Sequence, residues 1–184
     1  MKAKVNKVTI HAVHDDILLL DIDGLVNATQ SNLAISPELA TKAGPALQRA
    51  CAEIGWCEVG SAVITNAGNL PVKKVIHAVG PRWGEGSERG KLANATWESL
   101  RLAEMNQLRA IALPAISIGT SGYPLENCAK TMLKEIIDFT FEPLRFVRII
   151  TICLANQLEL EAFQQELQEQ LDTLKETGEG RVRI

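Results

Sequence analysis

Small polar residues and glycines gather in one stretch that follows an apolar strand. The segment 111–124 reads IALPAISIGTSGYP, and its turn contains Ser117, Ile118, Gly119, Thr120, Ser121 and Gly122. Glycine lets a backbone approach a ligand closely. Successive N–H groups in such a turn, close to the start of a helix, form a concavity that suits an anion. The hydroxyls of Ser117, Thr120 and Ser121 can add further donors.

The anion that this turn favours is a diphosphate or monophosphate. The turn lacks the Gly-Lys-Ser/Thr ending of a P-loop, so ATP hydrolysis is not indicated. An ordinary strand-to-helix turn that needs glycine for its geometry explains the same residues. Tyr123 follows directly, and its ring either covers a sugar or base of the ligand or closes the core.

Composition is that of a globular protein, with 46% hydrophobic and 22% charged residues in a chain of 184. The net charge of -3 argues against nucleic acid as a partner, but backbone N–H groups can still hold a small phosphorylated ligand. The cysteines and histidines show no metal-site spacing, so we expect free thiols, no metal and no cofactor. We find no signal peptide and no apolar stretch near the ~20 residues of a membrane helix, which favours a cytoplasmic protein without a membrane partner.

Periodicity and capping residues predict alternating strands and helices. Ser36 is a suitable N-cap before Pro37, and Gly44-Pro45 is expected to interrupt that helix and restart it to about Ile54. A single helical turn is expected at 16–20. We expect strands at Val5–Val13, Gly24–Ala28, Val59–Thr65, Lys74–Val79, Arg109–Ile116 and Phe146–Leu154, and further helices at Leu92–Met105, Pro124–Phe139 and Leu158–Leu174.

This alternation predicts an α/β domain, a mixed and largely parallel sheet with helices on both faces. Residues 1–175 should form one domain and residues 176–184 a frayed C-terminal tail. In such sheets ligands bind beyond the carboxyl ends of the strands. The loops that follow strands are therefore where a site is expected.

Three stretches together resemble the macro domain family, in an order and separation typical of it, over about residues 5–172. The first joins Asp16-Ile17 to the segment DGLVNA at 23–28. The second runs from GSAVIT at 60–65 to HAVGPRW at 77–83, and the third is PAISIGTSGYP at 114–124. The resemblance implies a three-layer α/β/α fold with a cleft for ADP-ribose.

The resemblance also implies roles for individual residues. Asp16 would accept a hydrogen bond from the adenine amino group, with Ile17 beside the base, and the loop from Ser117 to Gly122 would wrap the diphosphate. Tyr123 would lie against the distal ribose, near Asn27 and Gln30. Leu154 would cover the adenine at a position where relatives often carry an aromatic ring. Simpler explanations are a helix cap for Asp16 and a strand-end polar residue for Asn27.

The first ligand loop departs from the family pattern. Catalytically competent relatives usually carry a second asparagine, where this chain has Gln30, followed by glycines and an aspartate. Here no glycine lies between Gly24 and Gly44, and no aspartate lies between Asp23 and Asp138. Such a loop cannot easily turn several N–H groups onto a diphosphate. The catalytic residues are therefore unknown, since Glu38 suits the first turn of a helix and His77 suits the core.

Three hypotheses follow from these residues. The first is a module that binds free or protein-linked ADP-ribose, or a related nucleotide diphosphate, without turnover. The second is an ADP-ribosyl or O-acetyl-ADP-ribose hydrolase in which Gln30, Asn32 or groups of the substrate replace the aspartate. The third is a scaffold that has lost its ligand and binds a protein through the reshaped cleft or the last helix.

Overall fold

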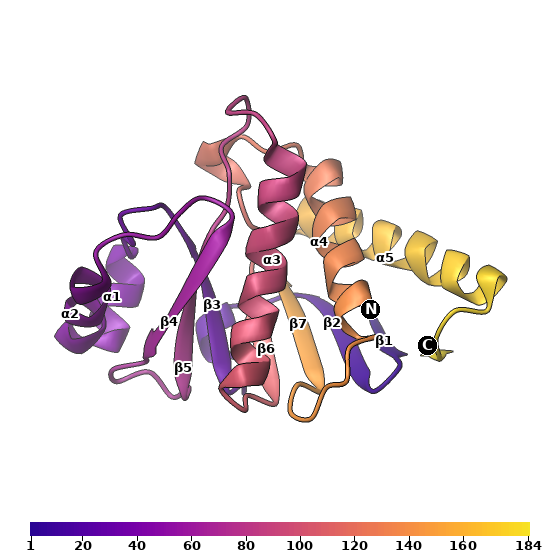
Figure 1. The fold of residues 1–184 in the computed structure, drawn as a ribbon, viewed down its shortest axis with the longest axis horizontal. Helices are drawn as coiled ribbons and strands as arrows, with labels where there is room; N and C mark the ends of the chain where they lie inside the picture. The colour runs from indigo at the N-terminus through magenta and orange to yellow at the C-terminus, as the bar shows by residue number, and fades with distance from the viewer.

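The computed structural model describes all of residues 1–184 as one eight-stranded sheet flanked by helices (Figure 1). The strand order is β4-β5-β3-β6-β7-β2-β1-β8. The strands are β1 (Lys2–Val5), β2 (Val8–His14), β3 (Gly24–Thr29), β4 (Ser61–Asn66), β5 (Lys74–Val79), β6 (Ala110–Leu113), β7 (Ile149–Leu154) and β8 (Val182–Arg183). The five central strands from β5 to β2 are mutually parallel, and the strands beyond them on both sides pair antiparallel.

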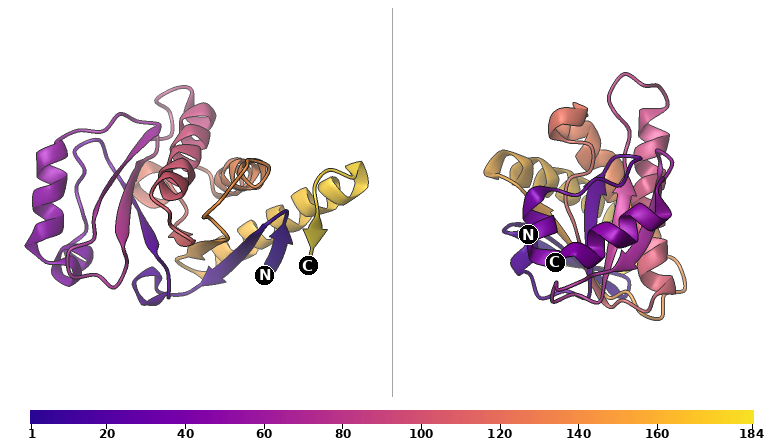
Figure 2. Two further views of the ribbon diagram at one scale, coloured as in Figure 1. Left: turned by 60° about the horizontal axis from the view of Figure 1, so that its bottom comes forward. Right: turned by 90° about the vertical axis from the view of Figure 1, so that its left-hand side faces the viewer.

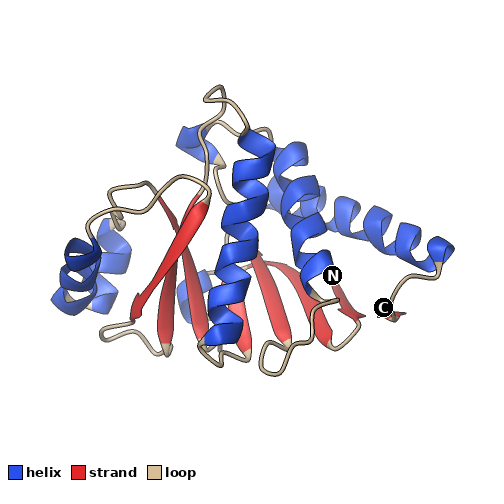
Figure 3. Cartoon of the chain, viewed as in Figure 1, coloured by secondary structure: helices blue, strands red, loops and turns tan.

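Five α-helices and two short 3-10 helices connect the strands (Figure 3). The α-helices are α1 (Pro37–Ala43), α2 (Pro45–Ile54), α3 (Glu88–Met105), α4 (Leu125–Phe139) and α5 (Gln157–Thr177), and the 3-10 helices are η1 (Ile17–Leu19) and η2 (Gly119–Ser121). The expected break between the first two helices is present. The side chain of Ser36 caps α1, and Gly44 separates α1 from α2. No helix combines the length and apolar character that a membrane crossing requires.

The core lies on both faces of the sheet. On one face α3, α4 and α5 pack side by side and cover residues such as Ile76, Ile111 and Ile152 (Figures 1 and 2). On the other face Leu39 and Leu47, from α1 and α2, pack against Leu25 of β3 and neighbouring residues. This is the three-layer α/β/α arrangement that the alternating pattern predicts, and the prediction is confirmed.

Parallel pairing brings the ends of five strands to one edge of the sheet. β2, β3, β5, β6 and β7 all end there, because their mutual pairing is parallel. The segments that follow these strands include η1, residues 30–36, Gly80 and residues 114–122. The topology therefore assembles at this edge the loops that the sequence marks as polar and glycine-rich.

The sequence misses three local features. A turn at Asn6 splits the single strand expected at Val5–Val13 into the β1–β2 hairpin. β6 ends at Leu113, three residues before the expected Ile116. The end of the chain is not frayed, because β8 pairs with β1 and the main chains of Asn6 and Arg181 are hydrogen-bonded at 2.7 Å. Two-residue strands carry too little pattern to be recognised in a sequence.

Truncation after Gly178 tests whether the domain ends before this last strand. We expect the shortened protein to fold and to unfold in one cooperative transition. The free energy of unfolding should fall by about 1–3 kcal/mol, because only a few hydrogen bonds join β8 to β1. Urea denaturation of both lengths measures this difference. Two separate transitions, or a chain that does not fold, would contradict the expected domain boundary.

Candidate functional site

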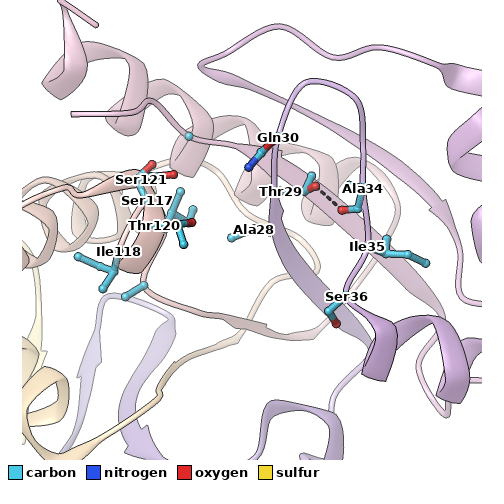
Figure 4. A pocket seen from close by; sticks show the side chains of 13 residues that line it. Ala28, Thr29, Gln30, Ala34, Ile35, Ser36, Ser117, Ile118, Thr120 and Ser121 are labelled. Carbon is cyan, nitrogen blue, oxygen red and sulfur yellow. Dashed lines mark hydrogen bonds between the residues drawn. The ribbon is translucent and has the colours of Figure 1, made fainter. Parts of the chain in front are cut away.

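Three adjoining hollows form one groove along the carboxyl edge of the sheet. The middle hollow, about 320 Å³, lies between residues 28–36 and residues 115–121 (Figure 4). The Asp16 hollow, about 280 Å³, shares Ala28 and Ser36 with it. The Arg82 hollow, about 200 Å³, shares Thr29, Gln30, Gly80 and Ser121 with it. A long ligand can therefore lie across all three.

Ser117, Ile118, Thr120 and Ser121 form one wall of the middle hollow. Residues 117–122 are called here the phosphate loop, after the ligand group that the sequence predicts for them. Two of its residues have the left-handed backbone conformation, Ser117 with φ 67° and Gly119 with φ 81°. A left-handed serine is strained, and such strain concentrates at functional sites. These two residues turn the chain sharply into η2.

The main-chain N–H groups of this wall are available to a ligand. Four consecutive N–H groups, those of Ile118, Gly119, Thr120 and Ser121, donate to no acceptor within the protein. The next N–H groups are used, since Gly122 donates to the Gly119 carbonyl and Tyr123 to the Ser117 carbonyl. Adjacent unpaired N–H groups at the start of a helical turn carry partial positive charge. The wall is therefore suited to an anion.

Ser117 adds a hydroxyl to the same wall. Its side chain is buried, yet its Oγ has no hydrogen-bond partner in the protein. A buried hydroxyl without a partner is rare, because leaving it unpaired costs about 1–3 kcal/mol. The serine packs directly on Gly80, where an added Cβ would lie 2.2 Å from Oγ. Glycine at position 80 therefore allows the loops after β5 and β6 to meet.

Residues 30–36 form the opposite wall, and three local hydrogen bonds hold this segment. Leu33 has φ 59°, and its N–H donates to the Gln30 carbonyl at 2.8 Å. The N–H of Ala34 donates to Asn32 Oδ1 at 3.1 Å, and the Thr29 hydroxyl donates to the Ala34 carbonyl (Figure 4). The N–H groups of residues 31, 32, 35 and 36 donate to no acceptor within the protein, but unlike those at 118–121 they do not form one continuous run. In Figure 4 the Gln30 side chain extends from the end of β3 toward the phosphate loop.

The Asp16 hollow combines a carboxylate with apolar walls. Asp16 Oδ1 accepts the N–H of Leu18 at 3.0 Å and so caps η1. The side chain is exposed, and its other oxygen accepts no hydrogen bond from the protein. The cap and a ligand contact are therefore compatible. Ile17, Leu18 and Pro114 give this hollow its apolar surface.

Asn27 lies beneath the groove and contacts a buried histidine. Its amide nitrogen is 3.2 Å from Nδ1 of His77, and Nε2 of His77 is 2.9 Å from the Thr65 hydroxyl. Asn27 also lines the Asp16 hollow. His77 is fully buried, and burial lowers its pKa to about 4. It is a neutral core histidine, as expected from the sequence, and it holds Asn27 in place.

Tyr123 and Leu154 do not reach the groove. The Tyr123 ring is buried on the helix side of the phosphate loop, where it packs edge-on against Trp83 with ring centroids 5.1 Å apart. Leu154 is fully buried in the core. Neither side chain lines any of the three hollows, and the expected contacts of Tyr123 with a sugar and of Leu154 with a base stay predictions. Gly122 also lines none of them, and a Cβ added there would lie 3.8 Å from Trp83 Cβ.

Several groove residues are not among those expected from the sequence. Arg82, Glu85 and Val59 line the Arg82 hollow, and Ile35 and Ser36 line the middle hollow. Residues 81–90 are polar and rich in glycine, but in the sequence they look like any surface loop. Only the pairing of β5 beside β3 brings this loop to the groove.

The family to which this arrangement belongs is decided by comparison with known proteins. The model of the family described as "Macro domain" matches residues 26–132. The chain belongs to the macro domain family. A relative named O-acetyl-ADP-ribose deacetylase, from Citrobacter koseri, is 41% identical over 72% of this chain and 81% of its own length. A macro domain-containing protein of Chlorobaculum tepidum is 35% identical over 88% of this chain and 97% of its own length.

Solved macrodomain structures share the fold over most of this chain. The Oceanobacillus iheyensis macrodomain with ADP superposes with a TM-score of 0.88 at 28% identity, and the match covers 94% of this chain and 97% of that one. The Trypanosoma brucei macrodomain in complex with ADP superposes with a TM-score of 0.79 at 26% identity, covering 86% and 68%. The macro domain fold predicted from the sequence is thus confirmed.

The buried His77 of this macro domain should make its stability depend on pH. In the unfolded chain a histidine takes up a proton near pH 6.5, whereas His77 in the folded chain does so only near about 4. Between these two values the unfolded state binds more protons, so stability falls as pH falls through this window. The loss should approach about 3 kcal/mol.

Urea denaturation between pH 7 and pH 4 measures this effect, with His77→Gln as the reference. Carboxylates titrate in the same window in both proteins, so only the difference between their two pH slopes belongs to His77. Identical slopes would show that His77 is protonated in the folded state as readily as in the unfolded one.

Proposed function

We propose that the groove binds ADP-ribose or a closely related nucleotide diphosphate, free or linked to a protein. The observation that carries this proposal is the run of four unpaired N–H groups at 118–121 in the wall of an open hollow. A diphosphate offers several charged oxygens to such a run. The Ser117 side chain in the same wall packs on Gly80 and so fixes where this run of N–H groups begins.

The Asp16 hollow fits the nucleoside end of this ligand. The free carboxylate oxygen of Asp16 can only accept hydrogen bonds, so it selects an exocyclic amine over a carbonyl. Ile17 lies beside it, and the apolar surface of Leu18 and Pro114 can lie against a base. Adenine has an amine at the required edge, whereas hypoxanthine has a carbonyl there.

The Arg82 hollow fits the distal ribose. It adjoins the middle hollow and shares no lining residue with the Asp16 hollow. Gln30 and Ser121 line both the middle hollow and the Arg82 hollow, where they would offer amide and hydroxyl groups to a sugar. Asn27 supports the floor of the groove from beneath, through its contact with His77.

The comparisons support the same ligand class. Macrodomain structures of two organisms contain ADP, and an Oceanobacillus iheyensis macrodomain variant is described with ADPR. Hydrolysis of an acyl-ADP-ribose is the second candidate, which the O-acetyl-ADP-ribose deacetylases among the relatives favour. A ligand-free scaffold is not favoured, because residues 34–36 line the middle hollow rather than fill it. The cytoplasm remains the proposed location, in keeping with four free thiols.

Thr120→Asp tests the position of the diphosphate. Thr120 is exposed in the phosphate loop, so the fold should tolerate the change. Like charges a few ångströms apart near a protein surface repel by on the order of 1–4 kcal/mol, so ADP-ribose should bind about 10-fold more weakly or worse. Isothermal titration calorimetry measures this loss. Thr120→Asn is the control, because asparagine has the shape of aspartate but no charge. It should bind ADP-ribose within a few-fold of the wild-type affinity. Equal affinity of both variants, or no heat with the wild-type protein, would refute the proposal.

Asp16→Asn tests the position of the base. Asparagine preserves an oxygen for the η1 cap but adds an amide donor. The wild-type protein should prefer ADP over IDP by roughly tenfold, since a buried mismatch of hydrogen-bonding groups costs about 1–3 kcal/mol. The variant should lose most of this preference, in calorimetric titrations with each nucleotide. An unchanged ratio of the two dissociation constants would place the base elsewhere.

A further inference from the structure

The Arg82 hollow contains a carboxylate. The first ligand loop, residues 30–44, contributes no acid to this hollow. Among the residues that line the three hollows, the acids are Asp16, Glu38 and Glu85. Asp16 and Glu38 line the Asp16 hollow, and no acid lines the middle hollow. Glu85 is therefore the one carboxylate at the distal end. It comes from the loop between β5 and α3, far in sequence from residues 30–44.

One carboxylate oxygen of Glu85 is hydrogen-bonded within its own loop, and the other has no partner in the protein. Its Oε2 accepts the main-chain N–H of Arg82 at 3.2 Å, and its N–H donates to the Arg82 carbonyl at 3.3 Å. These bonds close a tight turn that directs the side chain. No hydrogen bond within the protein reaches Oε1, which can accept a proton from a water molecule.

Arg82 supplies a cation beside this carboxylate. None of the four ion pairs of the structure includes Arg82, and its guanidinium donates no hydrogen bond within the protein. The side chain lines the same hollow as Glu85. A base and an unneutralised cation in one small hollow can serve the addition of water to a carbonyl group.

The loop that carries this pair is fixed to the phosphate loop. The N–H of Trp83 donates to the Ser121 carbonyl at 2.9 Å, and the Trp83 ring packs against Tyr123. On the far side, Glu88 Oε1 accepts the N–H groups of Gly84 and Gly86 at 2.9 and 3.0 Å. A ligand whose diphosphate rests on the phosphate loop is thus placed at a defined distance from residues 82–85.

We propose that Glu85 and Arg82 are catalytic residues, which hydrolyse a small acyl ester on the distal ribose of the bound ligand. This inference rests on the function proposed above. Val59, which lines the Arg82 hollow and is partly exposed, offers apolar surface to a short acyl chain. The volume of about 200 Å³ is enough for an acetyl group with part of the ribose.

The reaction needs only water as a second reactant. Glu85 takes a proton from water as the water oxygen bonds to the acyl carbon, and the carbonyl electrons move onto oxygen, where Arg82 stabilises the charge. The carbonyl then re-forms and the bond from the acyl carbon to the ribose oxygen breaks. The ribose oxygen takes the proton back from Glu85. The carboxylic acid product loses its own proton to solvent.

Glu85→Gln separates this chemistry from binding. With O-acetyl-ADP-ribose as the probe, acetate release should fall about 100-fold or more, the usual contribution of a general base. The affinity for ADP-ribose, measured by calorimetry, should stay within a few-fold of wild type. Arg82→Ala should slow release about 10- to 100-fold through loss of oxyanion stabilisation. Glu142→Gln, at an exposed acid outside every hollow of the groove, is the matched control and should leave the rate unchanged.

Chemical rescue distinguishes a base from a residue that only shapes the loop. Glu85→Ala should recover part of its rate when formate is added, because a small carboxylate can enter the vacated space. Glu85→Asp should retain more activity than Glu85→Gln. A wild-type rate in Glu85→Gln, or no rescue by formate in a folded Glu85→Ala protein, would refute the assignment.

The two proposals fail in different ways. A wild-type protein that binds ADP-ribose but releases no acetate would overturn the catalytic inference and leave the binding function intact. A wild-type protein that binds neither ADP-ribose nor the acetylated probe would overturn both. Release of acetate that stops with Thr120→Asp but continues with Glu85→Gln would confirm the groove and reject Glu85.

Discussion

The close contact of Ser117 with Gly80 is the constraint on which the groove depends. β5 and β6 lie on either side of β3, so the segments that follow them must converge above its end. Convergence is possible only because position 80 lacks a side chain, and an added Cβ would also lie 2.5 Å from Ile116 Cγ2. Ser117 takes a left-handed backbone at this contact, and the residues with unpaired N–H groups follow it directly. A steric requirement in the core thereby sets the path of the loop that forms one wall of the groove.

The two walls of the groove differ in how their free N–H groups are arranged. In the phosphate loop the unpaired N–H groups of 118–121 are consecutive, whereas in residues 30–36 the bonded N–H groups of Leu33 and Ala34 separate those of 31–32 from those of 35–36. A segment without glycine has fewer backbone conformations open to it, so it is less able to bring separated N–H groups onto one ligand group. Consecutive N–H groups form the better concavity for an anion.

The sequence predicts the fold well because the signals that define it are local. Ser36, Pro37 and Gly44 mark the limits of α1, and alternating or continuous apolar runs mark the central strands, all of which the structure contains. The features that the sequence does not predict depend on distant partners. β8 exists because β1 offers a free edge. Its two residues carry no pattern that distinguishes them from a tail.

The same contrast between local signals and distant partners explains which site residues could be predicted from the sequence. Ser117, Ile118, Thr120 and Ser121 follow one another in the chain, so a single motif locates them all. The motif cannot tell on which side of the backbone Tyr123 points, and packing against Trp83 turns it into the core. Arg82 and Glu85 reach the groove only through the order of strands in the sheet. No spacing in the sequence encodes that proximity.

The topology also explains how a carboxylate can line the Arg82 hollow although the first loop contains no aspartate. What hydrolysis requires is a carboxylate beside the reacting carbonyl, whichever segment supplies it. At the distal end of the groove the segments after β3 and β5 share one hollow, because their strands are neighbours and parallel. A carboxylate on either segment can therefore line the same hollow. Glu85 occupies the second of these two positions, and its turn with Arg82 gives it the fixed placement that an exposed side chain otherwise lacks.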